Sequence, residues 1–274
     1  LGVIIPPSIP FIMYGMASGE SVSDLFLAGI IPGLLISGFL MVYAWLYCRK
    51  NGEDREKIAD VVGELHKKGL AAVLKESFWA ILSPVIILGC IYTGLTSPTE
   101  AAVISVFYAL IVSLLIYKSI KAKELWPIFV EAVRTYGPIM FILAASVAFS
   151  RVLTLMQVPQ MVSAWILTHF TSKIVLLLVI NVFLLIVGMV MDTTPAILIL
   201  TPILLPIVEA AGMNGIHFGI MMVVNLAVGF VTPPIGVNLF VAGSITNVPV
   251  MHVARKAAPM IVYFLIALLL ITFI

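Results

Sequence analysis

The segments Ile5-Pro6-Pro7-Ser8-Ile9 and Val231-Thr232-Pro233-Pro234-Ile235 each place two adjacent prolines within an apolar stretch. A glycine stands four residues before the first proline of each pair, Gly2 in one case and Gly229 in the other. Because the same landmarks recur at the same offsets, the two segments indicate an internal duplication.

A later proline extends the match. Pro32 and Pro259 each follow the first proline of their pair by 26 residues, and we expect each of them to open a long apolar helix. The repeat therefore covers a helix break and the helix that comes after it.

The composition places these segments in a membrane. Of 274 residues, 62% are hydrophobic and 10% are charged, whereas a soluble domain is about half apolar and about a quarter charged. Uncharged runs approach the roughly 20 residues that a helix needs to cross the bilayer, and they lack the alternation of barrel strands. These observations predict an all-α polytopic membrane protein. The expected helices are Leu25–Tyr47, Phe78–Leu95, Ala101–Tyr117, Gly137–Met156, Ile174–Met191, Thr194–Val208 and Ala257–Ile274, with a broken crossing over Ile216–Asn247.

The basic residues predict which loops face the cytoplasm. All of the 15 Lys and Arg residues except Arg151 and Lys173 fall in 49–75, 118–134 and 255–256, so the positive-inside rule assigns these loops to the cytoplasm. The Pro6-Pro7 segment then crosses outward and the Pro233-Pro234 segment crosses inward. Similar segments of opposite orientation form an inverted repeat, which is typical of secondary transporters.

Two adjacent prolines explain why each crossing is broken. Each proline lacks an N–H and clashes with the preceding turn, so a pair ends the helix and releases carbonyl oxygens. Such a break survives in hydrocarbon only within protein or beside a polar cavity. We therefore expect Na⁺ ligands at two breaks, although proline kinks that serve packing alone are the alternative. The expected ligands are the carbonyls of Gly229, Thr232 and Ile235, with the Thr232 hydroxyl, and in the inverted copy Gly2, Ile5 and Ser8.

A second candidate element is the turn between the helices expected at 174–191 and 194–208. It contains Asp192, the only acidic residue in the interior of the apolar spans, followed by Thr193, Thr194 and Pro195. These residues predict a helix start facing a substrate or ion, since intramembrane ionisable groups are usually functional. Asp192 could instead merely cap the following helix, and the two helices could form a re-entrant hairpin or two full crossings.

Several other residues carry weaker signals. Asn238 could line the cavity or bond to another helix, and Arg151 could reach the membrane interface or bind an anion. The stretches Glu53–Lys75 and Lys121–Arg134 are amphipathic and could lie along the membrane surface. Ser97-Pro98-Thr99-Glu100 predicts a capping box at a helix start.

The motifs together resemble the large membrane subunit of TRAP (tripartite ATP-independent periplasmic) transporters. The resemblance covers the whole chain. It is carried by Ile4-Ile5-Pro6-Pro7-Ser8-Ile9-Pro10, Leu27-Ala28-Gly29-Ile30-Ile31-Pro32-Gly33, Ser97-Pro98-Thr99-Glu100-Ala101-Ala102 and Thr232-Pro233-Pro234-Ile235-Gly236. Because that subunit is longer and this chain starts at Leu1 within an apolar segment, we expect a piece lacking its N-terminal part.

The resemblance implies an elevator-type Na⁺ symporter of the bacterial cell inner membrane. Its fold would be that of the ion transporter superfamily, and Gly188 would join Gly229, Thr232 and Ile235 in the second Na⁺ site. The implied partners are a small four-helix membrane subunit and a periplasmic binding protein that delivers an organic anion, such as a C4-dicarboxylate or sialic acid. We expect residues 1–24 to end the first repeat, 25–134 to form scaffold helices and 135–274 to form the second repeat.

Other functions find less support in the sequence. A Na⁺/carboxylate symporter that needs no binding protein is the main alternative. We do not expect an enzyme, because the sequence contains no second intramembrane Asp, no G-x-S-x-G motif and no metal-binding His pair. It also lacks a P-loop and any stretch suited to nucleic acid, so the coupling ion is the only expected cofactor.

Overall fold

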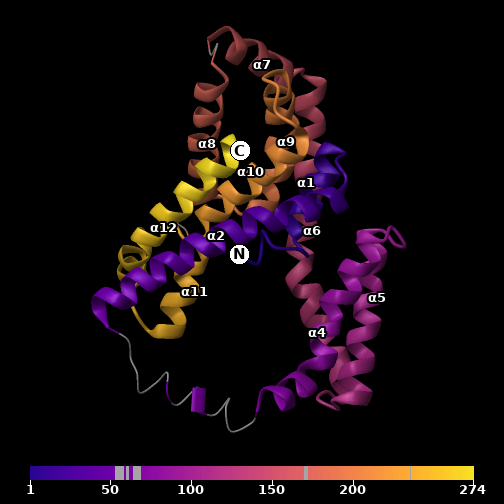
Figure 1. Ribbon diagram of the computed structural model, residues 1–274. Helices are drawn as coiled ribbons and strands as arrows, with labels where there is room; N and C mark the ends of the chain where they lie inside the picture. The colour runs from indigo at the N-terminus through magenta and orange to yellow at the C-terminus, as the bar shows by residue number, and fades with distance from the viewer. Residues whose placement is uncertain (53–58, 60–61, 64–68, 170–171, 235) are drawn as a thin grey trace. The chain divides into compact units, whose positions relative to one another are not determined.

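The fold is helical throughout the part of the chain that the computed structural model describes, which is residues 1–52, 59, 62–63, 69–169, 172–234 and 236–274 (Figure 1). Two short turns of other helix types, Val112–Ile116 (π) and Ala122–Glu124 (3₁₀), extend α5 and precede α6. The helices are α1 (Ile9–Ser18), α2 (Val22–Asn51), α4 (Leu70–Tyr92), α5 (Pro98–Ile111), α6 (Leu125–Leu155), α7 (Val158–His169), α8 (Lys173–Val190), α9 (Thr193–Ala210), α10 (Gly215–Gly229), α11 (Val237–Thr246) and α12 (Val250–Phe273).

Seven of the described helices are long and apolar enough to cross a membrane, and they include α2, α4, α8, α9 and α12. This confirms the polytopic all-α class predicted from composition. The helices α10 and α11 are shorter, with 15 and 10 residues. Since a residue adds about 1.5 Å of rise, neither crosses about 30 Å alone, and together they form the broken crossing expected over Ile216–Asn247.

The chain divides into two compact units, residues 1–43 with 136–274 and residues 44–135. The first unit contains both double prolines, the α8–α9 hairpin and α12. It also contains residues 25–43, which we expected among the scaffold helices. The boundaries of the units fall inside α2 and α6, so these two helices belong to both.

Helix α10 is the centre of the first unit. Nearly all its side chains are buried, and it packs against α1, α8, α9 and α12. A helix that is apolar on every face needs such cover. Its start is fixed by Asn214, whose side-chain oxygen accepts a hydrogen bond from the Ile216 amide at 2.8 Å. Its end, at Gly229, brings the second helix break into the middle of the unit.

The structure supports the predicted inverted repeat. Each double proline is followed by a helix of ten residues, α1 or α11, and then by a long helix with an internal proline, α2 or α12. The helices α2 and α12 run side by side in opposite directions (Figure 1), with the rings of Tyr43 and Tyr263 5.5 Å apart. The expectation that Pro32 and Pro259 open their helices is wrong, because both lie inside them.

The helices α8 and α9 form a hairpin whose tip lies beside the second break. They have 18 residues each and are joined by Met191 and Asp192 alone. Gly188, near this tip, packs on Leu226 and Gly229 of α10. Both helices are long enough to cross a membrane, so the re-entrant hairpin and two full crossings both stay predictions.

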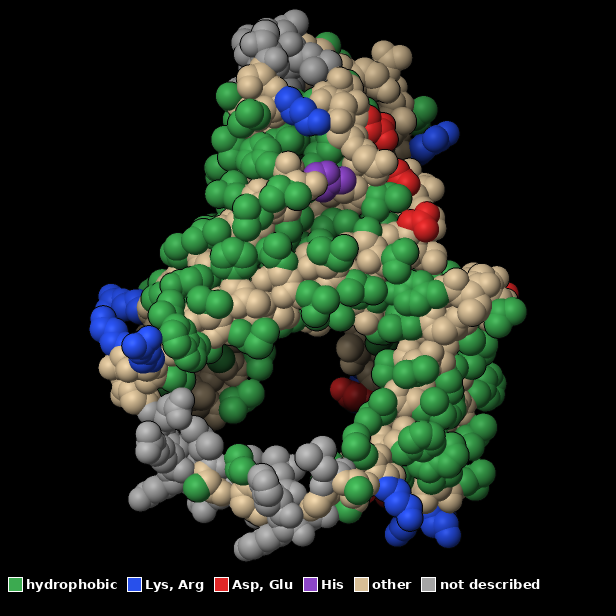
Figure 2. Space-filling view, viewed as in Figure 1, with side chains coloured by type: hydrophobic (Ala, Val, Ile, Leu, Met, Phe, Trp, Pro, Cys, Tyr) green, Lys and Arg blue, Asp and Glu red, His purple; other side chains and the backbone are tan. Residues whose placement is uncertain are grey.

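The second unit is dominated by the packing of α4 on α5. The capping box is confirmed, since the Ser97 amide donates to the Glu100 carboxylate at 2.7 Å and the Glu100 amide donates to the Ser97 hydroxyl at 3.3 Å. Most apolar side chains of α4 and α5 are exposed, and hydrophobic side chains cover the visible helix surfaces while charged ones form a few small groups (Figure 2). Such surfaces suit lipid or other apolar helices.

One expectation about the loops needs correction. The stretch Lys121–Arg134 is not a separate surface helix, because α6 continues from Leu125 through Pro138 to Leu155. Pro138 lies inside this helix in an exposed position and does not end it, since transmembrane helices tolerate an internal proline. The short helix α7 was not predicted. Most of the amphipathic stretch Glu53–Lys75 lies outside the described residues.

The packing of α1 on α10 gives a first testable prediction. The buried Tyr14 hydroxyl donates a hydrogen bond to the Gly215 carbonyl oxygen at 2.6 Å. We expect Tyr14→Phe to lower the free energy of unfolding by about 1 kcal/mol, because it removes a buried hydrogen bond between α1 and α10. Chemical unfolding in lipid nanodiscs measures the change.

Tyr108→Phe is the matched control, since the Tyr108 hydroxyl donates to the Trp79 carbonyl at 2.7 Å in an exposed position. Its loss is expected to cost less than about 0.5 kcal/mol. Equal effects of the two substitutions would contradict the role given to the buried bond.

Candidate ion and substrate site

The second helix break shows what the two prolines do to the backbone. Pro233 and Pro234 lack the amides that would bond to the carbonyls of Gly229 and Phe230 in a continuous helix. Both carbonyls find new donors: the Thr232 amide donates to Gly229 at 3.1 Å, and the Asn238 amide donates to Phe230 at 3.0 Å. We had expected the Gly229 carbonyl to lack an amide partner, and this expectation is wrong.

Thr232 offers two oxygen atoms to a cation at the break, its carbonyl oxygen and its hydroxyl oxygen. Among the described residues, no backbone amide donates to its carbonyl oxygen. Its half-buried hydroxyl donates to the Val228 carbonyl at 2.7 Å, which leaves the lone pairs of the hydroxyl oxygen available to a cation. Ile235, the third expected ligand, lies outside the described residues.

Gly188 and Gly229 bring the hairpin tip into contact with the break. A Cβ atom on Gly229 would overlap the carbonyl oxygen of Gly188, and one on Gly188 would lie 3.1 Å from the carbonyl oxygen of Leu226. Position 229 is therefore restricted to glycine by the close approach of two backbones, whereas a side chain at position 188 would require α10 to shift by a few tenths of an ångström. The expected second-site residues Gly188, Gly229 and Thr232 thus lie together on α8, α10 and the segment after α10.

The hairpin tip presents polar groups at the start of α9. Asp192 occupies the N-cap position with extended backbone angles, but its exposed side chain makes no capping hydrogen bond. Simple capping therefore does not account for Asp192. Thr193 is buried and Thr194 is half-buried, and the first turn of α9 directs unpaired amides towards this tip, where a helix dipole favours negative charge.

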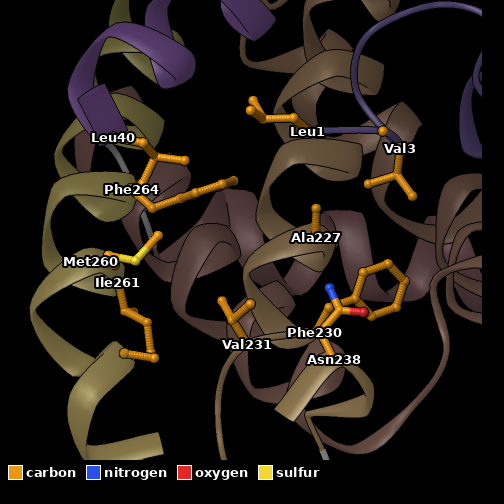
Figure 3. A pocket seen from close by; sticks show the side chains of 12 residues that line it. Leu1, Val3, Leu40, Ala227, Phe230, Val231, Asn238, Met260, Ile261 and Phe264 are labelled. Carbon is orange, nitrogen blue, oxygen red and sulfur yellow. The ribbon is translucent and has the colours of Figure 1, made fainter. Parts of the chain in front are cut away.

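A pocket of about 330 Å³ lies between the flanks of the two breaks. Leu1, Gly2 and Val3 border it on one side, and Ala227, Phe230, Val231 and Asn238 on another (Figure 3). Met260, Ile261 and Phe264 of α12 and Leu40 of α2 complete the wall. Asn238 therefore lines a cavity, and residues from both copies of the repeat line the same pocket.

The first break has a backbone hydrogen bond equivalent to one in the second break. The Ile4 amide donates to the Leu1 carbonyl at 2.9 Å, as the Val231 amide donates to the Val228 carbonyl at 3.1 Å. The buried Ser8 hydroxyl donates to the Val3 carbonyl at 2.5 Å and caps α1 by accepting from the Phe11 amide at 3.4 Å. Ser8 therefore has a structural role in the break.

The first expected ion site lacks the close packing of the second. A Cβ atom on Gly2 would meet nothing within 4 Å, so no helix approaches it as α8 approaches Gly229. The structure brings Gly2, Ile5 and Ser8 to the same turn around Pro6 and Pro7, but it places no hairpin tip among the described residues against them.

Comparison with known proteins agrees with this architecture. The family described as "Tripartite ATP-independent periplasmic transporter, DctM component" matches residues 1–274. The chain belongs to this family. This confirms the resemblance seen in the sequence, and it places the chain in the bacterial inner membrane as a multi-pass protein.

Individual relatives of the DctM family are named as transporter permeases. The chain is 41% identical over its whole length to the isethionate TRAP transporter permease protein DctMQ of Oleidesulfovibrio alaskensis, of which it covers 42%. It is 38% identical over its whole length to the C4-dicarboxylate TRAP transporter large permease protein DctM of Pseudomonas aeruginosa, covering 63% of it. It is 35% identical over 99% of its length to the sialic acid TRAP transporter large permease protein SiaM of Vibrio cholerae, covering 62% of it.

The chain therefore spans less than two thirds of the length of these DctM relatives. Their names as permeases also support the expectation that the chain is not an enzyme. The sequence does not reveal the direct contact between Gly188 and Gly229, because a glycine shows its packing partner only in three dimensions.

The glycine contact gives a second testable prediction. We expect Gly229→Ala to destabilise the protein by about 3 kcal/mol, because the new methyl group overlaps the backbone of α8 and packed cores resist added volume. Gly38→Ala is the control, since a Cβ atom there meets nothing within 4 Å and alanine favours a helix over glycine by about 1 kcal/mol. Thermal unfolding of both variants measures the difference, and a harmless Gly229→Ala would refute the close approach.

Proposed function

We propose that this chain forms the ion-coupled core of a permease that takes up an organic acid with Na⁺. The observation that carries the proposal is the contact of the α8–α9 hairpin with the end of α10, where the backbones of Gly188 and Gly229 meet just before Thr232. Broken helices near the bilayer midplane hold coupling ions in secondary transporters, because unwound carbonyls and helix ends supply oxygen ligands there.

The ion site consists of the carbonyl oxygens of Gly188, Gly229, Thr232 and Ile235, with the Thr232 hydroxyl as a further oxygen. Gly229 keeps one carbonyl lone pair free after accepting the Thr232 amide, because a carbonyl oxygen has two. A second, inverted ion site at Gly2, Ile5 and Ser8 completes the arrangement in the whole protein.

The substrate site lies at the hairpin tip and the adjoining pocket. An organic carboxylate would bind near Thr193 and Thr194, where the first turn of α9 offers amide donors, while Asn238 lines the cavity between the breaks. Relatives named for C4-dicarboxylates and sialic acid support an organic acid as the substrate. Asp192 would lie beside the bound ion rather than beside the anion.

Transport would proceed by an elevator movement. The compact unit that contains the broken helices and hairpin is the moving part, and residues 44–135 contribute to a scaffold. Coupling follows from linkage: Na⁺ bound at the breaks raises substrate affinity, and bound substrate raises Na⁺ affinity by the same factor.

The proposed partners are a small membrane subunit and a periplasmic binding protein. The family description names a tripartite system. The exposed apolar faces of α4 and α5 suit contact with lipid and with another membrane subunit. In this system the binding protein delivers the acid to the permease.

The Thr232 hydroxyl gives the third prediction. We expect Thr232→Ala to raise the Na⁺ concentration that half-activates uptake by about tenfold, equivalent to about 1.4 kcal/mol for one lost ligand. Uptake of radiolabelled C4-dicarboxylates is measured in proteoliposomes that contain the full permease and its binding protein.

Thr246→Ala is the matched control, because the Thr246 hydroxyl donates to the carbonyl four residues before it at 2.7 Å, as that of Thr232 does. Its Na⁺ activation should match that of the wild type. Unchanged Na⁺ activation in Thr232→Ala would remove this residue from the ion site.

The requirement for a binding protein is the fourth prediction. We expect proteoliposomes with the permease alone to show uptake at least about tenfold slower than those supplied with the binding protein, because delivery raises the local substrate concentration. The control omits Na⁺ instead of the binding protein. Equal uptake with and without the binding protein would favour a self-sufficient Na⁺/carboxylate symporter.

A further inference from the structure

Three buried polar side chains form a cluster around α10. Asn181 of α8, Asn225 of α10 and Thr272 of α12 are exposed by 3%, 0% and 1%. Polar side chains in such buried positions are costly unless they find partners. We call the pair Asn181 and Asn225 the asparagine clasp.

The hydrogen bonds of the clasp fix both amide groups. Asn225 Nδ2 donates to Asn181 Oδ1 at 2.7 Å and to the Asn181 carbonyl at 3.1 Å. Asn181 Nδ2 donates to the Leu177 carbonyl at 2.9 Å and to Thr272 Oγ1 at 3.2 Å. A rotated Asn225 amide would place its oxygen against two acceptors, so the observed orientation is the favourable one.

The clasp also contains an unpaired acceptor. Asn225 Oδ1 is buried and has no hydrogen-bond partner among the described residues. Two apolar side chains of the same size would avoid this desolvation cost, and replacing both partners of a buried bond is often neutral or stabilising. The clasp is therefore better explained by what it specifies than by the stability that it adds.

The position of the clasp shows what it specifies. Asn225 precedes Gly229 by four residues on α10, and Asn181 precedes Gly188 by seven residues on α8. Residues at these spacings share one face of a helix, so the clasp and the Gly188–Gly229 contact lie along the same seam between α8 and α10. Two glycines have no side chains that interlock, and their register needs a directional bond elsewhere on the seam.

We propose that the asparagine clasp positions the hairpin tip against the helix break and thereby sets the affinity for Na⁺. Asn181 and Asn225 are positioning residues, because they lie about two and one helical turns from Gly188 and Gly229 and act through the register of α8 on α10. The proposal rests on the ion site proposed above. It predicts that losing the clasp weakens Na⁺ binding without unfolding the protein.

The test compares Asn225→Leu with the double variant Asn181→Leu/Asn225→Leu. The double variant also removes the Asn181 amide, which loses its Asn225 partner in the single variant. Thr201→Val is the control, because Thr201 is fully buried and its hydroxyl donates only to the sulfur of Met222 at 3.7 Å. The thermal stability of the full permease is measured in NaCl titrated against choline chloride. We expect both clasp variants to need about tenfold more Na⁺ for half-maximal stabilisation, a coupling typical of residues in one network.

The double variant separates positioning from packing. If the clasp serves only packing, this variant regains both stability and wild-type Na⁺ dependence, and the proposal is overturned. If the clasp positions the tip, stability without Na⁺ recovers while the Na⁺ requirement stays high. The Thr201→Val protein is expected to keep the wild-type requirement in either case.

Hydrogen exchange of the tip amides Met191–Thr194 in Na⁺-free buffer tests the clasp independently of ion coupling. We expect exchange about tenfold faster in both clasp variants than in the wild type, because a tip without register opens more often. Unchanged exchange overturns the proposal. If the wild type gains no stability from Na⁺, the proposed ion coupling fails, and the exchange result alone then decides whether the clasp holds the tip.

Discussion

Backbone hydrogen bonding inside a membrane is the constraint on which this structure depends. Water cannot satisfy a carbonyl there, so each carbonyl released by a proline must find a donor or face a polar cavity. At the second break, the amides of Thr232 and Asn238 bond to the two carbonyls that Pro233 and Pro234 deprive of partners. The chain leaves the helix for a short distance only, and a new helix starts at Val237.

The two breaks solve this problem in related ways. In both, the carbonyl four residues before the second proline receives a bond from a residue further along, from Ser8 to Val3 in one copy and from Asn238 to Phe230 in the other. The copies differ in what packs against them. Gly229 meets the backbone of α8, whereas nothing among the described residues lies within 4 Å of a Cβ atom on Gly2, so in the described part of the chain the second break is packed more closely than the first.

Local chemistry made much of this predictable from the sequence. Long uncharged runs gave the spanning helices, the double prolines gave the breaks, and Ser97 with Glu100 gave the start of α5. The prediction was weaker where tertiary packing decides. Pro32, Pro138 and Pro259 lie inside long helices, and the sequence around a single proline does not show whether a membrane helix continues through it or ends there.

The same limit applies to the candidate site. Gly188, Gly229 and Thr232 were expected near one another, but the contact between the two glycine backbones required the fold. Asn181 was overlooked, although an asparagine within the apolar run of α8 is a visible signal of a buried polar contact. Its partner Asn225 is 44 residues away along the chain, and only the packing of α8 on α10 joins them.

Equilibrium binding of radioactive sodium to the purified full-length permease tests the central claim most directly. The account predicts saturable binding that excess unlabelled Na⁺ displaces and equal K⁺ does not, because closely spaced carbonyls at a helix break suit one small cation. Absence of saturable binding, or equal displacement by K⁺, would contradict a selective Na⁺ site where the hairpin tip meets the broken helix.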